Sequence, residues 1–96
     1  MMRRYSYFLI SRRPNRKRLA ETLGANVREL RLEQGLSITK LSYISKISRA
    51  LIREIERGTS DVRLSYVERL AAALCVDAEQ LFVDFEQDGG PRFLGY

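Results

Sequence analysis

Two short amphipathic segments, Ser37–Ser45 and Ser48–Arg57, constrain the fold more than any other feature of the chain. Each segment has a serine where a helix N-cap belongs, and Gly58 ends the second. Only three to four residues separate the two, so the chain must turn sharply between them. Apolar residues recur every three positions, as expected for one buried helix face: Leu41 and Ile44 in the first segment, Ile52 and Ile55 in the second.

Further helical segments flank this pair. One helix is expected before it, stopped at Gly35, with a buried face made of Leu19, Ala20, Leu23, Val27 and Leu30. A fourth helix follows the loop 59–61, with an apolar side made of Leu64, Val67, Leu70, Ala71 and Leu74.

A short fifth helix is expected from Asp77, because Gln80 three residues later completes a capping-box pattern. It runs through Leu81 and Phe82. Beyond it we expect a turn at 87–91 and a short tail, and no strand is demanded anywhere in the chain. Cys75, at the end of the fourth helix, is interpreted as a small buried apolar residue. The fold class is therefore all-α with five helices.

Positive charge is concentrated at the N-terminus. Seven of the 17 basic residues lie within residues 1–18, which hold no acid, and the whole chain has a net charge of +5. A basic arm on a near-neutral body indicates a polyanionic partner, either nucleic acid or an anionic membrane surface. We interpret residues 1–17 as this arm, either a disordered tail or an ordered DNA-contacting arm. Its apolar run, Tyr5 to Ile10, could also pair as a strand or pack on a partner subunit.

The composition excludes several classes of protein. With no histidine and one cysteine, the chain can form no intrachain disulfide and no conventional zinc site. It also lacks the partners for serine–histidine or cysteine–histidine catalysis, so we expect no enzyme activity, metal or cofactor. The N-terminal apolar run is too short for a signal peptide, which needs about 7–15 apolar residues, or for a spanning helix, which needs about 20. A cytoplasmic protein outside the membrane is expected.

A short turn between two helices is the geometry of a helix-turn-helix, whose second helix lies in the major groove of DNA. With its flanking helices, the chain resembles the lambda-repressor and Cro-like, or XRE, family of transcription regulators. The resemblance runs from Leu23 to Phe82, and its most specific part is Ile52-Arg53-Glu54-Ile55-Glu56-Arg57-Gly58. It implies a domain over residues 18–83 and a tail over 84–96.

The chain departs from the family pattern at three positions. Ile38 replaces a glutamine that reaches a phosphate, so this anchor is lost or moved to Lys40 or a backbone amide. Lys46 replaces a glycine of the turn, so either Lys46 accepts a strained dihedral or the turn reshapes. Val62 replaces a frequent proline, which matters little. A scaffold that kept the fold and lost DNA binding is the alternative interpretation.

The resemblance implies which residues would contact DNA. The first turns of the segment 48–57 would face the groove, and the residues expected at base edges are Arg49, Ala50, Arg53 and Glu54. The residues expected at phosphates lie at helix ends or carry positive charge: Ser37, Lys40, Ser48, Arg57 and Arg63.

The resemblance also implies a structural ion pair and a dimer. Arg31 and Glu56 are expected to form a salt bridge that joins the first helix to the end of the third. Regulators of this type bind a palindromic operator as two-fold dimers. The apolar residues after Leu81 are candidates for dimer contacts or for a lid on the core, with these as interface candidates: Phe82, Val83 and Phe85.

Three functions remain open. The first is a sequence-specific regulator that binds double-stranded DNA as a homodimer. The second is an antitoxin-type protein, whose domain binds an operator while a terminal segment binds a partner protein. The third is a peripheral membrane or adaptor protein that uses the basic arm and Phe8 to Ile10.

Overall fold

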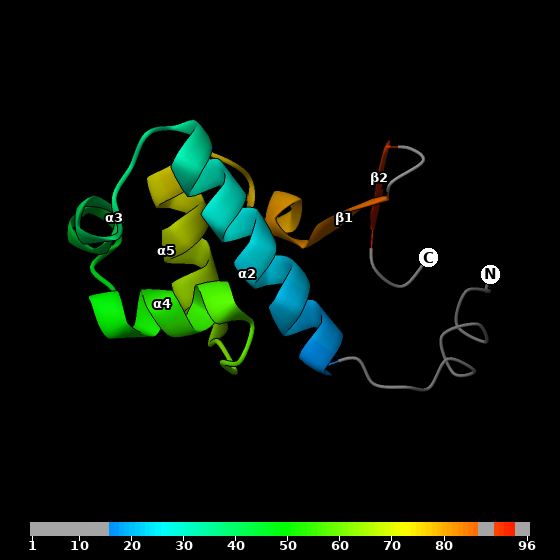
Figure 1. Ribbon diagram of the computed structural model, residues 1–96, viewed down its shortest axis with the longest axis horizontal. Helices are drawn as coiled ribbons and strands as arrows, with labels where there is room; N and C mark the ends of the chain where they lie inside the picture. The colour runs from blue at the N-terminus through cyan, green and yellow to red at the C-terminus, as the bar shows by residue number, and fades with distance from the viewer. Residues whose placement is uncertain (1–15, 87–89, 94–96) are drawn as a thin grey trace.

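The computed structural model describes residues 16–86 and 90–93, with the surroundings of side chains described from Leu19 to Val83. Within these residues, four α-helices are followed by one 3-10 helix and a two-stranded hairpin (Figure 1). The elements, in order, are α2 (Arg16–Glu33), α3 (Ile38–Ser45), α4 (Arg49–Arg57), α5 (Leu64–Leu74), η1 (Ala78–Phe82), β1 (Val83–Glu86) and β2 (Gly90–Phe93). The basic arm expected over residues 1–17 lies outside the described residues, apart from the start of α2.

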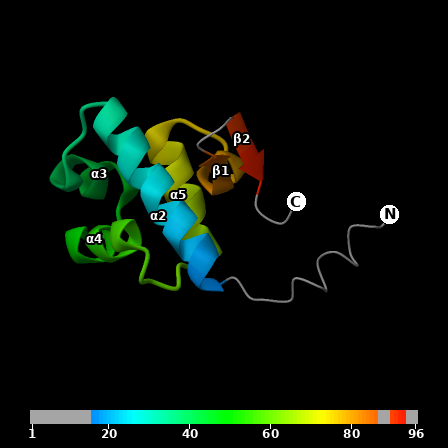
Figure 2. The same ribbon diagram turned by 45° about the vertical axis from the view of Figure 1, so that its right-hand side comes forward.

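The core lies between α2 and the helices that follow it. In Figures 1 and 2, α2 runs diagonally across the molecule, with α3 and α4 toward one end and the hairpin at the other. Every helix contributes an apolar face to the core, as the periodicity predicts. The fully buried side chains are Val27, Leu41, Ile52, Ile55, Leu70, Leu74 and Leu81.

Gly24 allows α2 to lie unusually close to α4. A Cβ atom at this position would stand 2.1 Å from the carbonyl oxygen of Ile55. No real side chain tolerates that distance from a backbone atom, so the two helices can meet this way only because glycine has no Cβ. This contact fixes the position of α4 against α2.

Three apolar residues expected on buried faces are exposed instead. Leu19 is 41% exposed, Ile44 is 42% exposed and Leu64 is 78% exposed. In α3 the inward face runs through Leu41 and Ser45, four residues apart, so Ile44 is turned outward. Leu19 and Leu64 belong to the first turns of α2 and α5, at the edge of the buried faces.

Left-handed residues end the helices. Gly35 and Gly58 have φ values of 69° and 78°, which glycine adopts without steric penalty, and both stop helices where expected. Cys75 also adopts this conformation, with φ 61°, and its N–H caps the end of α5. The interpretation of Cys75 as buried is wrong: its position just past the last turn of α5 leaves it exposed.

The C-terminal region differs from the five-helix expectation. The segment Ala78–Phe82 forms a 3-10 helix and not an α-helix, which accords with its length of five residues. The expected contact at its start is present: Gln80 Oε1 accepts a hydrogen bond from the N–H of Asp77 at 2.9 Å. Two antiparallel strands then follow where a turn and a short tail were expected, with Val83 opposite Phe93 and Glu86 opposite Gly90.

Asn26 fastens this C-terminal region to α2. Its side-chain Nδ2 donates to the carbonyl oxygens of Leu81 at 2.8 Å and of Val83 at 2.9 Å. These two bonds satisfy backbone groups at the junction of η1 and β1. They join residues more than 50 positions apart in the chain, so the first described helix and the last are parts of one unit.

Among the described residues, no helix is long and apolar enough to cross a membrane.

Candidate nucleic-acid interface

The frame of the site consists of α3, a three-residue turn and α4. Ser37 and Ser48 cap the two helices: Ser37 Oγ accepts from the N–H of Lys40 at 2.9 Å, and Ser48 Oγ accepts from the N–H of Leu51 at 3.1 Å. Both serines are at the N-cap positions expected from the sequence. Each cap satisfies one of the unpaired N–H groups of the first helical turn, which stabilises the helix start.

In the turn between the two helices, Lys46 adopts the backbone conformation that favours glycine, and this strains Lys46. This residue has φ 63° and ψ 35°, the left-handed conformation that disfavours side chains with a Cβ atom. Its N–H donates to the carbonyl of Ser42 at 2.9 Å, and Ser42 Oγ donates to the carbonyl of Ile47 at 2.6 Å. Of the two outcomes considered for Lys46, the structure therefore has the strained dihedral and not a reshaped turn.

One face of α4 is buried and the opposite face is free. Ile52 and Ile55 are 0% and 1% exposed and hold the helix on the core. The four expected base-contacting residues all lie on the exposed side: Arg49, Ala50, Arg53 and Glu54. Among the residues that the structure describes, no hydrogen bond or ion pair engages their side chains. Leu51 is half-buried and packs against the core at the edge of this face.

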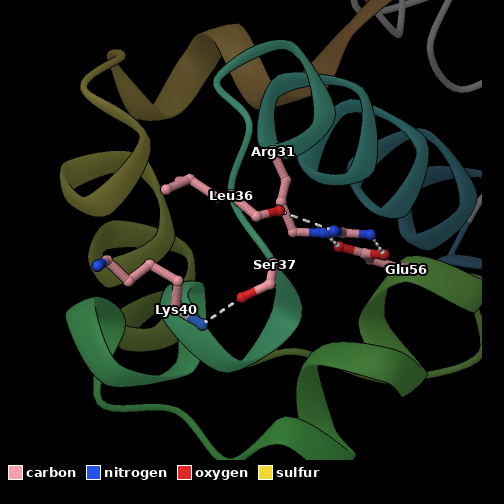
Figure 3. A network of polar contacts seen from close by, with 5 residues as sticks. All are labelled: Arg31, Leu36, Ser37, Lys40 and Glu56. Carbon is pink, nitrogen blue, oxygen red and sulfur yellow. Dashed lines mark hydrogen bonds and ion pairs between the residues drawn. The ribbon is translucent and has the colours of Figure 1, made fainter.

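Arg31 joins three segments that frame the site (Figure 3). Its Nε donates to Glu56 Oε2 at 2.7 Å and its Nη2 donates to Glu56 Oε1 at 3.1 Å, a two-point contact between α2 and α4. Its Nη1 also donates to the carbonyl of Leu36 at 2.9 Å, just before α3. The structure thus places Arg31 and Glu56 in the pair that the sequence suggested.

This ion pair is largely withdrawn from water. The side chains of Arg31 and Glu56 are 10% and 8% exposed. The hydrogen bond to Glu56 raises the pKa of Arg31 above its ordinary value, against a lowering effect of burial. The guanidinium is therefore charged throughout the neutral range and orients α4 relative to α2 and the start of α3.

The expected phosphate-contacting residues all have exposed side chains. They lie at helix ends in or next to the frame of the site: Ser37 and Lys40 at the start of α3, Ser48 at the start of α4, Arg57 at the end of α4, and Arg63 before α5. In Figure 3 the Lys40 side chain extends away from the Arg31 network. Ile38, where the family pattern has glutamine, is half-buried and packs against the core.

Of the three residues that the sequence suggested for a dimer interface, the two whose side chains are described differ in how far they are buried. Val83 is 8% exposed and belongs to the buried residues, and Phe82 is half-buried against the core. The backbone of Phe85 lies in β1 opposite Pro91, while its side chain falls outside the described part of the structure.

Sequence reasoning missed several residues that position the site. Gly24 was a detectable signal, because a glycine inside a helical pattern often marks a close approach of two backbones. Asn26 and Gln34 gave no such signal, since polar residues on a helix are usually exposed. Gln34 Nε2, from the residue that follows α2, donates to the carbonyl of Leu74 at 2.8 Å and so caps the end of α5.

Comparisons with known proteins agree with this geometry. A family model described as a helix-turn-helix domain matches residues 22–81. The restriction-modification controller protein C.AhdI from Aeromonas hydrophila is 35% identical, with a TM-score of 0.64, and the match covers 66% of this chain and 96% of that one.

Two further solved structures are similar. The hypothetical transcription factor NHTF from Neisseria is 34% identical, with a TM-score of 0.64, over 71% of this chain and 78% of that one. The clp gene regulator ClgR from Corynebacterium glutamicum is 28% identical, with a TM-score of 0.63, over 66% of this chain and 67% of that one. No curated protein matches the chain.

Proposed function

The chain belongs to the family of helix-turn-helix domains and is a DNA-binding transcription regulator, and we propose that it binds a palindromic operator as a homodimer. In this proposal α4 enters the major groove of each half-site. The observation that carries it is the exposed face of α4, whose polar side chains have no partner among the described residues, on a frame fixed by two caps and a buried ion pair.

Base recognition belongs to the exposed face of α4. Arg49 and Arg53 lie four residues apart, so both project from the same side of the helix. An arginine can donate two hydrogen bonds to a guanine, the methyl of Ala50 can touch a thymine methyl, and Glu54 can accept from a cytosine amine. Each two-point contact discriminates against a wrong base by about 1–3 kcal/mol.

Phosphate contacts would come from the ends of the frame. The starts of α3 and α4 present unpaired N–H groups near Ser37 and Ser48, and such helix ends attract anions. Lys40, Arg57 and Arg63 add positive charge around the same face. Because Ile38 packs against the core, Lys40 and the backbone at the start of α3 take over the contact that glutamine makes in the family pattern.

Selection of bound duplexes from a random DNA pool, at near-physiological salt, tests the proposal. We expect a two-fold symmetric motif whose half-sites are centred about 10 base pairs, or one helical turn, apart. Recovery of no motif, with binding that disappears as salt rises, would show that the chain binds polyanions without reading sequence.

The homodimer can be tested separately by sedimentation over a range of concentrations. Because Val83 is buried within one chain, Phe85 is the candidate to change. We expect Phe85→Ser to weaken self-association and binding to the full operator, while binding to an isolated half-site stays the same. Unchanged self-association would place the interface elsewhere.

An antitoxin-type protein is the second candidate. The family match ends at residue 81, and the hairpin of β1 and β2 lies beyond it, which supports a separate role for this segment in binding a partner protein. Removal of residues 84–96 separates the two candidates. Loss of a protein partner with DNA binding kept would favour the antitoxin, whereas loss of dimerisation would favour the simple regulator.

A further inference from the structure

Two positively charged side chains lie over tyrosine rings at the turn between α3 and α4. Lys46 Nζ is 5.5 Å from the centre of the Tyr43 ring, and Arg69 Cζ is 5.3 Å from the centre of the Tyr66 ring. Both distances are typical of cation–π contacts. Arg69 Nη1 also donates to the backbone carbonyl of Lys46 at 3.3 Å, so the guanidinium of Arg69, from α5, lies against the backbone of the turn that carries Lys46.

This pair of cations is not neutralised within the described residues. Lys46 and Arg69 are exposed, and the ion pair found between Leu19 and Val83 is that of Arg31 with Glu56. The tyrosine rings contribute attraction to the cations but no negative charge. Positive charge held in place without a carboxylate partner attracts an anion.

The conformation of Lys46 suggests that its side chain has a function. Its φ of 63° is one that glycine would adopt without penalty, whereas lysine is strained there. Strain of this kind is found mostly at positions where the residue contributes to binding. Removing the side chain should therefore relieve strain and remove the function at the same time.

We propose that Lys46 and Arg69 form a phosphate-binding pair that contacts the DNA backbone beside the groove occupied by α4. The inference rests on the proposed function and adds a contact surface on the α5 side of the turn. The turn immediately precedes α4, and Lys46 stands three residues before Arg49, the first helical residue. The stacked tyrosines restrict both long side chains before DNA binds, which lowers the entropy lost on contact.

Lys46→Gly is the sharpest test, because stability and binding should change in opposite directions. We expect the melting temperature to be unchanged or higher, since glycine accepts the left-handed turn. Affinity for DNA should fall severalfold, and the slope of log affinity against log salt should decrease by about 0.9, the value for one lost phosphate contact. Lys46→Arg, which keeps the charge, should restore both affinity and slope.

Arg69→Gln should also lower the salt slope by about 0.9, and the double variant by about twice as much. The matched control is Arg28→Gln, which removes the same charge from an exposed position on α2. The slope separates a phosphate contact from a merely structural effect of Arg69 on the turn, because a distorted turn would weaken binding at every salt concentration alike.

The outcomes distinguish this inference from the proposed function. If the unaltered chain binds no DNA, both are wrong. If it binds an operator, and Lys46→Gly and Arg69→Gln bind with the same affinity and slope as Arg28→Gln, only the phosphate-binding pair is wrong. Variants that bind DNA normally and lose an acidic protein partner would likewise overturn the pair as a DNA contact.

Discussion

At the scale of single residues, the position of the recognition helix depends on groups that never face DNA. Gly24 allows the backbones of α2 and α4 to meet, and Arg31 ties the same two helices through Glu56. Each acts on α4 from its buried side. Changes at these residues should therefore alter DNA binding through the stability and placement of α4.

Gly24→Ala should destabilise the protein, although alanine is favoured over glycine in a helix interior by about 1 kcal/mol. The added Cβ would lie 2.1 Å from the Ile55 carbonyl oxygen, so α2 and α4 must separate. Overpacking of this kind costs about 1–3 kcal/mol, which urea unfolding can measure. Ala25→Gly, at an exposed neighbouring position, is the control that isolates helix propensity. A Gly24→Ala protein as stable as the original would mean that the helices do not meet this closely.

Glu56→Ala should be strongly destabilising, because it leaves the charge of Arg31 buried without its carboxylate partner. Loss of one member of a buried pair costs about 3–5 kcal/mol. Thermal unfolding should show a lower midpoint than for Glu54→Ala, an exposed glutamate on the same helix. A midpoint and a DNA affinity of Glu56→Ala equal to those of the unaltered protein would rule out an orienting role for the pair.

The same pair has a defined dependence on pH. Because the pKa of Arg31 is raised in the folded protein, its contribution to stability is complete at neutral pH. It is lost only as the pH rises through that raised value.

At the scale of elements, the two faces of α4 have different roles: one packs against the core and the other is available for base recognition. Its buried isoleucines fix the helix, and its exposed face is available to DNA. Substitutions on the two faces should consequently have different effects on specificity and stability.

Arg49→Ala should relax the base preference at one position of each half-site by about 1–3 kcal/mol and leave the melting temperature nearly unchanged. Repeating the duplex selection with this variant measures the preference at every position. Arg57→Ala is the comparison, because loss of a phosphate contact should weaken binding to all sequences to a similar extent. If Arg49→Ala selects the same motif with undiminished preference, Arg49 does not contact a base.

The sequence predicted the helices well where local signals agree with packing. Helix boundaries at Ser37, Ser48, Gly35 and Gly58 follow from capping and from left-handed glycine, which are properties of a few neighbouring residues. The exposed face of α4 follows from the buried positions of Ile52 and Ile55.

Features that depend on distant partners were not predictable in this way. Ile44 is exposed because the partners of α3 lie on the Leu41 and Ser45 side, which periodicity in eight residues does not specify. The cation pair at the turn needs α5 to bring Arg69 to Lys46, 23 positions earlier in the chain. The two strands after η1 depend on pairing with each other, and the short segments carry little local signal.

At the scale of the whole molecule, charge is distributed unevenly: the N-terminal 18 residues hold seven basic residues and no acid. This segment precedes a domain whose recognition helix is held independently of it, by contacts within residues 19–83. The arm should therefore add affinity that depends on salt, without determining sequence preference.

Deletion of residues 1–15 tests whether the arm contributes affinity alone and the domain determines sequence preference. We expect the shortened protein to select the same DNA motif, with lower affinity and a smaller slope of log affinity against log salt. Circular dichroism should show that α2 to α5 remain folded. Loss of the motif would mean that the arm reads sequence, and binding of the intact chain to anionic vesicles but not to duplex DNA would favour a membrane role.

The two hydrogen bonds from Asn26 to Leu81 and Val83 have a consequence for how the protein is made. During synthesis, α2 leaves the ribosome before η1, yet its partners Leu81 and Val83 belong to the last part of the domain to be translated. The emerging chain must therefore carry α2 with part of its apolar face uncovered until residue 83 has been added. Completion of the domain, and with it access to an operator, thus requires translation through residue 83.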